Sequence, residues 1–164
     1  MIEHKTALLF PGQGTHYVGM GRDIYDKHQV VRGVYDKAAE ILDIRTKAMS
    51  LGRLQYFGFK RTDYVQIAIF VTNHAIYELF RSKYPDLKYH ATAGHSLGEY
   101  NALVASGAIS FEDALPLVHK RGKYMHESSS KFNGGLVALI AKNHTDLRKQ
   151  LGELETKEVY PALV

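Results

Sequence analysis

Five consecutive residues, Gly94-His95-Ser96-Leu97-Gly98, match the G-x-S-x-G pattern of a nucleophile elbow. In such an elbow a serine occupies a strained turn between a strand and a helix, so that its hydroxyl is exposed at the helix N-terminus. Free backbone N–H groups and the helix dipole there favour negative charge on a bound carbonyl oxygen. The motif therefore indicates acyl chemistry at Ser96. The alternative is a chance match, because five loosely specified positions recur often.

The segments on either side of this motif have the pattern that an elbow requires. Lys88–Ala93 is predicted to form a short strand, and Leu97–Ser106 is predicted to form a helix that Gly107 closes. Strand, tight turn and helix therefore follow one another in the order that exposes a serine nucleophile.

Gln13 is a second candidate, in the loop Pro11–Gly14 that follows a predicted apolar strand, Thr6–Phe10. In α/β proteins, ligands bind at the carboxyl edge of the sheet, where a loop amide can donate hydrogen bonds. A glutamine between two glycines more often completes a turn, so both interpretations stay open at this point.

Arg121 is a third candidate, at the edge of an apolar helical stripe. Ser110 and Asp113 form a capping-box pattern, and the helix that follows is predicted to bury Phe111, Ala114, Leu115, Val118, Gly122 and Met125. Arg121 should then be partly buried, and its planar guanidinium would match a substrate carboxylate in two hydrogen bonds. An internal ion pair with one of the 17 acidic residues, or exposure of the charged end to water, would explain the same position.

Strand-like and helical segments alternate along the rest of the chain, which is typical of an α/β fold with a largely parallel sheet. Helices are predicted at Gly19–Tyr25 and Val30–Leu42, and the apolar stretch Gln66–Arg81 is predicted to be a buried helix. A polar linker, Glu127–Gly135, is followed by a second unit with a strand at Leu136–Ala141, a helix at about Thr145–Glu155 and a strand at Val159–Val164.

The composition excludes several classes of protein. The 164 residues amount to one domain, and no apolar run approaches the ~20 residues that span a bilayer. The start has no signal-peptide pattern, so we expect a cytoplasmic protein without membrane attachment. The net charge of +4 comes from scattered residues, which argues against binding of nucleic acid. A modest positive charge would still favour the approach of an acidic protein partner through electrostatic steering.

No bound cofactor or metal is expected either. The glycines after Phe10 fit neither a dinucleotide-binding loop nor a P-loop. The nine histidines lack compact ligand spacing, and the chain has no cysteine.

Four motifs occur in order along the chain: FPGQG at 10–14, QIAIF at 66–70, GHSLGEY at 94–100 and RGKYM at 121–125. Together they resemble the malonyl-CoA:acyl carrier protein transacylases, a family that includes the stand-alone enzymes of fatty acid synthesis and the acyltransferases of polyketide synthases. The resemblance covers the whole chain. It implies transfer of a malonyl group from coenzyme A, through a seryl ester, to the phosphopantetheine thiol of an acyl carrier protein.

The same resemblance implies a role for each matching residue. Ser96 would be the catalytic nucleophile, Gln13 and the backbone N–H of Leu97 would form the oxyanion hole, and Arg121 would bind the malonyl carboxylate. The coenzyme A thioester would be a substrate, with no cofactor bound, and malonyl-CoA and an acyl carrier protein would be the partners. The remaining substrate-binding residues would be Gln66 and His95.

The resemblance also implies a division of the chain: an α/β-hydrolase-like large subdomain over residues 1–130 and the beginning of a small ferredoxin-like subdomain over residues 131–164. Ile67 departs from the family, which usually has proline there. The family also continues beyond Val164, with a segment that carries the histidine that activates its serine. We therefore expect about the first half of a transacylase, with the missing C-terminal half as a further partner. An acyl-thioester hydrolase on the same scaffold and a non-catalytic fragment are the alternatives.

Overall fold

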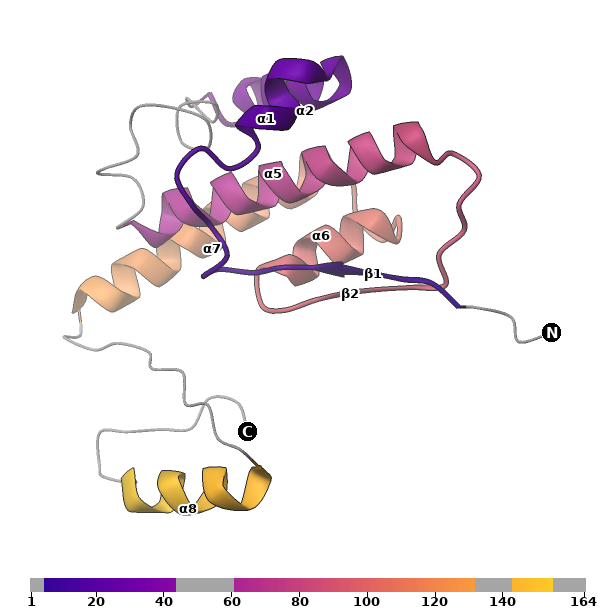
Figure 1. Ribbon diagram of the computed structural model, residues 1–164. Helices are drawn as coiled ribbons and strands as arrows, with labels where there is room; N and C mark the ends of the chain where they lie inside the picture. The colour runs from indigo at the N-terminus through magenta and orange to yellow at the C-terminus, as the bar shows by residue number, and fades with distance from the viewer. Residues whose placement is uncertain (1–4, 44–60, 132–142, 155–164) are drawn as a thin grey trace. The chain divides into compact units, whose positions relative to one another are not determined.

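The computed structural model describes residues 5–43, 61–131 and 143–154. The chain divides into two units, Met1–Phe132 and Asn133–Val164. The described elements of the first unit are, in chain order, β1 (Ala7–Phe10), α1 (Arg22–Lys27), α2 (Gln29–Leu42), α5 (Thr62–Lys83), β2 (Ala91–Gly94), α6 (Gly98–Ala105) and α7 (Phe111–Lys131) (Figure 1). The described part of the second unit contains α8 (His144–Leu154).

The two strands β1 and β2 lie side by side and run parallel (Figure 1). Their register pairs Ala7 with Ala91 and Phe10 with Gly94. Parallel strands need a crossover connection, and here it includes α5. Because both strands end at the same edge, the loop after β1 and the turn after β2 are neighbours. A parallel pair with helices packed around it confirms the predicted α/β class.

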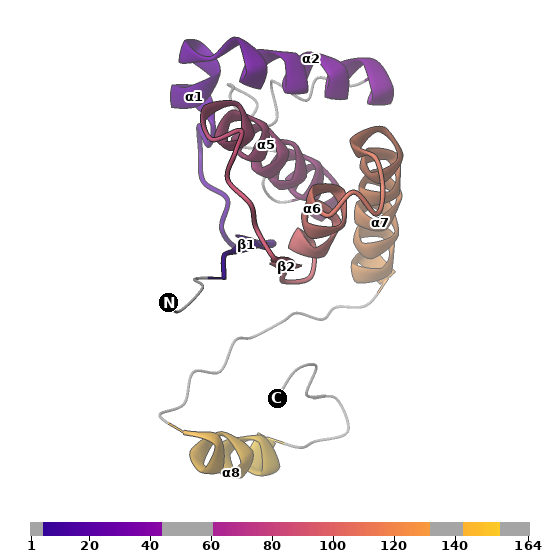
Figure 2. The ribbon, with the colours of Figure 1, turned by 90° about the vertical axis from the view of Figure 1, so that its right-hand side faces the viewer.

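The long helix α5 is the centre of the core. It packs against α7, α2 and α6, and Figure 2 shows it beneath α2 and beside α7. Its central residues from Val65 to Ala75 are all buried, which confirms the buried helix predicted from the apolar stretch. The largest fully buried side chains on this helix are Phe70, Ile67, Ile69 and Gln66.

The predicted helix Gly19–Tyr25 is wrong at its start, because α1 begins only at Arg22. Gly19 and Gly21 have φ angles of 82° and 81°. This left-handed conformation is open to glycine and incompatible with a right-handed helix.

The predicted polar linker is wrong over residues 127–131, which extend α7 to Lys131. The serine hydroxyls there find partners within the helix: Ser129 and Ser130 donate to the carbonyl oxygen of His126 at 3.0 and 2.8 Å. These hydroxyls are thus satisfied within the helix, so a serine-rich segment is compatible with it. Residues 132–135 of the predicted linker lie outside the described residues.

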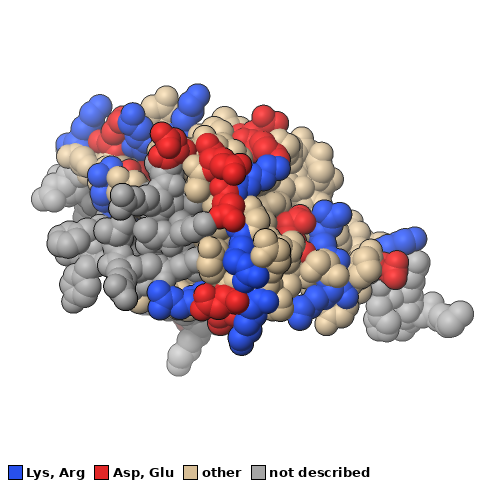
Figure 3. Space-filling view, turned by 90° about the horizontal axis from the view of Figure 1, so that it is seen from above, with Lys and Arg blue, Asp and Glu red and all other residues tan. Residues whose placement is uncertain are grey.

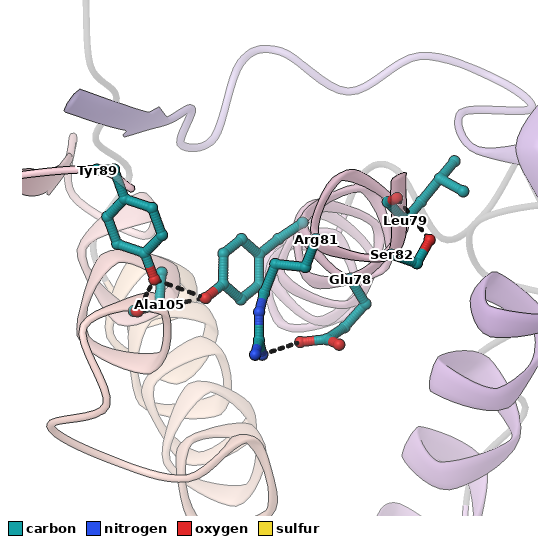
Figure 4. A network of polar contacts seen from close by, with 7 residues as sticks. Glu78, Leu79, Arg81, Ser82, Tyr89 and Ala105 are labelled. Atoms are coloured by element: carbon teal, nitrogen blue, oxygen red, sulfur yellow. Dashed lines mark hydrogen bonds and ion pairs between the residues drawn. The ribbon is translucent and has the colours of Figure 1, made fainter. Parts of the chain in front are cut away.

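The strand predicted at Lys88–Ala93 begins later, at Ala91. Before it, the hydroxyl of Tyr89 donates to the carbonyl oxygen of Ala105 at 2.5 Å and lies 2.8 Å from the hydroxyl of Tyr77 (Figure 4). This contact ties the segment before β2 to α5 and α6. Burial, together with the Tyr89 hydrogen bond, raises the pKa of Tyr77 above its ordinary value.

Both predicted helix starts in the C-terminal part have side-chain caps. The backbone N–H of Asp113 donates to Ser110 Oγ at 3.1 Å, which confirms the capping pattern before α7. Likewise, the N–H of Asp146 donates to Asn143 Oδ1 at 2.9 Å at the start of α8. The strands predicted at residues 136–141 and 159–164 lie outside the described residues, so the ferredoxin-like subdomain and the boundary at 130/131 stay predictions.

The surface carries mixed charge. On the face shown in Figure 3, acidic and basic side chains are interspersed, and the ion pairs include Lys37 with Glu112 and Arg81 with Glu78. No helix within residues 5–43, 61–131 or 143–154 is both long and apolar enough to cross a membrane.

His74 makes the stability of the core dependent on pH. Its side chain is buried, its ring stacks on Phe111 with centroids 4.2 Å apart, and burial, with the positive charges of Lys37 and Arg81, lowers its pKa to about 4. The unfolded chain therefore takes up this proton first, near pH 6.5. The contribution of His74 to the free energy of unfolding should be constant above that pH and fall by up to about 3 kcal/mol as the pH drops toward 4.

Urea unfolding between pH 7 and pH 4 measures this loss. The control is His74→Phe, which cannot titrate and keeps a ring against Phe111. Its unfolding free energy should decline less over that range. Parallel curves for the two proteins would contradict the assignment to His74.

Candidate active site

Ser96 sits on a sharp turn between β2 and α6. Its φ of 53° lies in the left-handed region, which is strained for any residue other than glycine. The turn is held by His95, whose N–H donates to the carbonyl oxygen of Phe10 and whose own carbonyl accepts from the N–H of Gly98 at 2.9 Å. The serine side chain is exposed. This is the backbone conformation that the elbow motif predicts.

Gly98 allows the elbow to press against the end of β1. A Cβ at this position would overlap the carbonyl oxygen of Phe10 and lie 2.9 Å from the carbonyl oxygen of Pro11. Any side chain would therefore push α6 away from the strand. The close approach brings the start of α6 beside the loop that carries Gln13.

Leu97 provides a backbone N–H beside this loop. Its side chain is fully buried and serves as an anchor, and its nitrogen lies 3.6 Å from the point that a Cβ on Gly12 would occupy. Leu97 is the N-cap of α6, and the first N–H groups of a helix have no partner within it. The two sequence-predicted oxyanion donors thus lie on adjacent segments.

Arg121, on α7, reaches the serine directly. Its Nη2 donates to Ser96 Oγ at 2.9 Å, and its Nη1 donates to Gln66 Oε1. The residue is half-buried, as predicted. Among the described residues its hydrogen-bond partners are these two neutral oxygens, and it forms no ion pair with a described carboxylate. The internal ion pair considered for this arginine is therefore not found within the described ranges.

Gly122 explains why Arg121 lies so near α5. A Cβ on Gly122 would lie 2.7 Å from the Cα of Asp63, so only glycine lets the two helices approach this closely. Asp63 is itself held by Arg61, through hydrogen bonds of 2.7 and 3.1 Å. Burial alone raises the pKa of Asp63, but the hydrogen bonds and charge of Arg61 outweigh it, and the net pKa lies below its ordinary value.

Gln66 is fully buried and uses both ends of its amide. Its Oε1 accepts from Arg121, while its Nε2 donates to Thr62 Oγ1 at 3.1 Å and to Met125 Sδ at 3.3 Å. Met125 was expected on the buried stripe, and that prediction is wrong, since 40% of it is exposed. Its sulfur instead contacts the amide of Gln66, the same side chain that Arg121 contacts.

Thr62 completes a continuous polar chain by donating to Gln13 Oε1 at 2.9 Å. Four of the sequence-predicted residues are therefore linked, from Ser96 through Arg121 and Gln66 to Gln13. The side chain of His95 is exposed beside the serine, and its backbone holds the elbow.

Three further residues were missed by the sequence reasoning. One is Thr62, and the others are the buried amides of Asn73 and Asn101. Asn73 Nδ2 donates to the carbonyl oxygen of Pro11 at 3.0 Å and to Asn101 Oδ1 at 3.1 Å, and Asn101 Nδ2 donates to the carbonyl oxygen of Phe70 at 3.0 Å. They tie the loop before Gln13 to α5 and α6. The available signal was an asparagine within each of two largely apolar helical segments.

The arrangement suits nucleophilic attack on a carbonyl carbon. It combines an exposed, strained serine, a guanidinium at hydrogen-bond distance and a helix N-terminus that favours developing negative charge. Within the described residues, no three His, Asp or Glu side chains are grouped to hold a metal ion.

Comparison with known proteins matches residues 7–163 to the acyl transferase domain. A malonyl CoA-acyl carrier protein transacylase of Bacillus subtilis is 37% identical over 157 residues, which cover 94% of this chain and 47% of the relative. The chain thus spans about half the length of the curated relatives it matches.

Solved structures agree with this relationship. A malonyl CoA-acyl carrier protein transacylase from Clostridium perfringens superposes with a TM-score of 0.73 at 33% identity, over 92% of this chain and 46% of that one. A malonyl transacylase in complex with its type II polyketide synthase acyl carrier protein gives a TM-score of 0.69 at 34% identity, over 76% of this chain and 40% of that one.

Proposed function

The chain belongs to the acyl transferase domain family, and on that premise we propose that it carries the nucleophile of a malonyltransferase. The enzyme moves a malonyl or similar dicarboxylic acyl group from coenzyme A to the phosphopantetheine thiol of an acyl carrier protein, in fatty acid or polyketide synthesis. One observation carries this proposal: the guanidinium of Arg121 lies 2.9 Å from the hydroxyl oxygen of Ser96. A cation so close to the nucleophile can bind the free carboxylate of an acyl group attached there.

The proposed reaction consists of two acyl transfers. Ser96 Oγ attacks the thioester carbonyl and loses its proton to a base, and the C–S bond breaks to release coenzyme A, which takes up that proton. The carrier thiol then loses its proton to the base and attacks the seryl ester, the C–O bond to Ser96 breaks to leave a malonyl thioester on the carrier, and Ser96 Oγ takes up that proton. Each step develops an oxyanion, for which the amide of Gln13 and the N–H of Leu97 are the proposed donors.

Arg121 supplies the proposed selectivity. Its planar fork can hold a carboxylate in two parallel hydrogen bonds. A malonyl group provides that carboxylate, whereas an acetyl group leaves a half-buried cation without an anion. Discrimination by an unpaired polar group in a binding site exceeds what one methylene in an apolar pocket provides. His95, exposed beside the serine, is proposed to contact the substrate.

We also propose that activity requires the region that corresponds to the second half of the relatives, on the same or on another polypeptide, and we call this combination the complete enzyme. That region is proposed to bring the histidine that acts as the base.

An apolar groove of about 230 Å³ beside β1 supports docking of that region onto the chain. The groove is lined in part by Leu8, Leu9, Phe10, Ile76 and Phe80. Leu9 is 76% exposed. Such an uncovered face beside a strand is a natural packing surface. The proposed location stays the cytoplasm.

The wild-type complete enzyme tests the function with malonyl-CoA and a carrier protein. Mass spectrometry should find a malonyl ester on Ser96 and then malonyl on the carrier thiol. Release of free malonate without carrier acylation would identify a hydrolase instead. An enzyme that neither acylates nor hydrolyses would contradict both activities and leave a binding role.

A further prediction concerns residues 1–164 alone. Without the base and with the β1 face uncovered, this chain should self-associate and turn over malonyl-CoA at a rate near background. Adding the second half should restore a monodisperse, active enzyme, measured by light scattering and by carrier acylation. Rapid transfer by residues 1–164 alone, dependent on Ser96, would contradict this requirement.

A further inference from the structure

A cavity of about 460 Å³ lies among α2, α5 and the start of α7. These three helices pack against one another (Figure 2). The described residues that line the cavity include none of the candidate active site, and the proposed chemistry does not use them. Its volume falls in the ~300–1,000 Å³ range that is typical of small-molecule sites. The cavity is therefore a candidate for a second ligand site.

His74 offers an unused polar group to this cavity. Its side chain is only 8% exposed and lines the cavity. Within the described residues neither ring nitrogen makes a hydrogen bond, and neither is sealed from solvent. Burial, together with the charges of Lys37 and Arg81, lowers the pKa of His74 to about 4, so the ring is neutral at pH 7 and carries one N–H. That N–H is free to donate to a ligand.

The first turn of α7 provides further donors beside His74. The imidazole stacks on Phe111, the first residue of α7, with ring centroids 4.2 Å apart. Ser110 caps the N–H of Asp113, whereas the N–H groups of Phe111 and Glu112 have no partner within the helix. Both of these residues line the cavity. Their N–H groups and the positive end of the helix dipole favour an anion there.

The charged side chains at the cavity suit a single negative charge. Arg81 pairs with Glu78 (Figure 4), and Lys37 pairs with Glu112, so these two positive and two negative charges balance. Both cations still act on the buried imidazole, since they lower the pKa of His74. A monoanion beside His74 would therefore be attracted, whereas a dianion would be repelled more strongly by the two glutamates.

The remaining walls of the cavity are apolar. Val34 and Phe111 are buried, and Val30, Val104 and Ile109 are partly buried. All five line the cavity. A hydrocarbon chain placed against them would be removed from water, which is favourable.

We propose that this cavity binds an organic monocarboxylate with a short hydrocarbon chain. Its carboxylate accepts from the N–H of His74 and from the first turn of α7, and its chain lies against the apolar walls. This site does not depend on acyl transfer at Ser96. Because the cavity shares no described residue with the candidate active site, binding there should not require Arg121.

Hexanoate, titrated into the complete enzyme at pH 7, tests the proposal by calorimetry and by NMR of the histidine side chains. It should bind with a Kd of about 1 mM or tighter. It should also shift the resonances of His74, which are identified by their absence in His74→Phe. 1-Hexanol lacks the charge and inorganic phosphate lacks the chain, so each should bind at least about tenfold more weakly.

Four variants locate the site. His74→Phe keeps a ring on Phe111 and removes the donor, so hexanoate should bind at least about fivefold more weakly. Lys37→Ala changes an exposed position and should weaken binding about two- to fivefold. Lys27→Ala is its matched control, because Lys27 is exposed on α1 and does not line the cavity. Lys27→Ala and Arg121→Ala should both keep the wild-type affinity.

The proposal is overturned if hexanoate does not bind at concentrations up to about 10 mM. Equal affinity for 1-hexanol or for phosphate would also overturn it, as would unchanged hexanoate affinity in both His74→Phe and Lys37→Ala. Loss of binding in Arg121→Ala would place hexanoate at the candidate active site instead and overturn it too. Should His74→Phe not fold, the comparison of Lys37→Ala with Lys27→Ala decides alone.

Discussion

Ser96→Ala should abolish the malonyl ester and reduce carrier acylation by the complete enzyme on the order of 10⁴-fold or more, as removal of a covalent nucleophile does elsewhere. The loss should appear in the rate constant for acylation. Binding of malonyl-CoA should persist, because the guanidinium of Arg121 and the N–H of Leu97 stay in place. Intact-protein mass spectrometry after mixing with malonyl-CoA, combined with a carrier acylation assay, measures both effects.

Folding should be unaffected by this change, since the Ser96 side chain is exposed. Ser106→Ala is a matched control at the other end of α6, where the Ser106 hydroxyl donates to the carbonyl oxygen of Leu103 at 2.8 Å. It removes a serine hydroxyl from the same helix without touching the site and should retain full activity. A malonyl group found on another residue of the Ser96→Ala enzyme would disprove the assignment of the nucleophile.

Arg121→Ala should lower the kcat/KM for malonyl transfer by about 30-fold to several thousand-fold, which corresponds to the ~2–5 kcal/mol cost of removing one member of a desolvated charge pair. Transfer of an uncharged acetyl group should suffer much less, because it never paired with the cation. Steady-state kinetics with malonyl-CoA and acetyl-CoA gives, for each substrate, the ratio of kcat/KM between the wild type and Arg121→Ala. Their difference reports the carboxylate contact.

Two further variants on α7, one at Lys123 and one at Arg121 itself, sharpen this test. Lys123→Ala removes an exposed cation from the same helix. It changes the local charge as much as Arg121→Ala does, but it should leave the preference for malonyl over acetyl unchanged. Arg121→Lys keeps the charge but loses the planar fork, so it should recover only part of the malonyl rate. Equal losses for both acyl groups in Arg121→Ala would count against a carboxylate contact and favour a role in holding Ser96 and Gln66.

Much of the fold could be predicted from the sequence because its signals are local. The elbow motif, the apolar strand before Pro11 and the capping residues each act within a few positions of the chain. The central helix is also a local signal, since it is apolar on nearly every face. The errors in helix boundaries occurred at the left-handed glycines before α1 and at the serines that continue α7, and a separate error concerned the burial of Met125.

The candidate site was predictable as a set of residues but not as an arrangement. Ser96, Gln13 and Arg121 were identified from motifs, and the family resemblance assigned each a role. Sequence alone left the partner of Arg121 open, because an ion pair and a substrate carboxylate both suit a half-buried arginine.

The sequence by itself determined the strained serine turn, the elements beside it and the family, because these depend on neighbouring residues and on ordered motifs. Only the tertiary structure decided what Arg121 touches and how Thr62 joins Gln13 to Gln66. Arg121 lies 25 and 55 positions from its partners Ser96 and Gln66, and Thr62 lies 49 positions from Gln13. These contacts exist because Gly122 lets α7 approach α5 and because β1 and β2 end at the same edge of the sheet. Such contacts depend on how whole helices pack, and no local pattern encodes that packing.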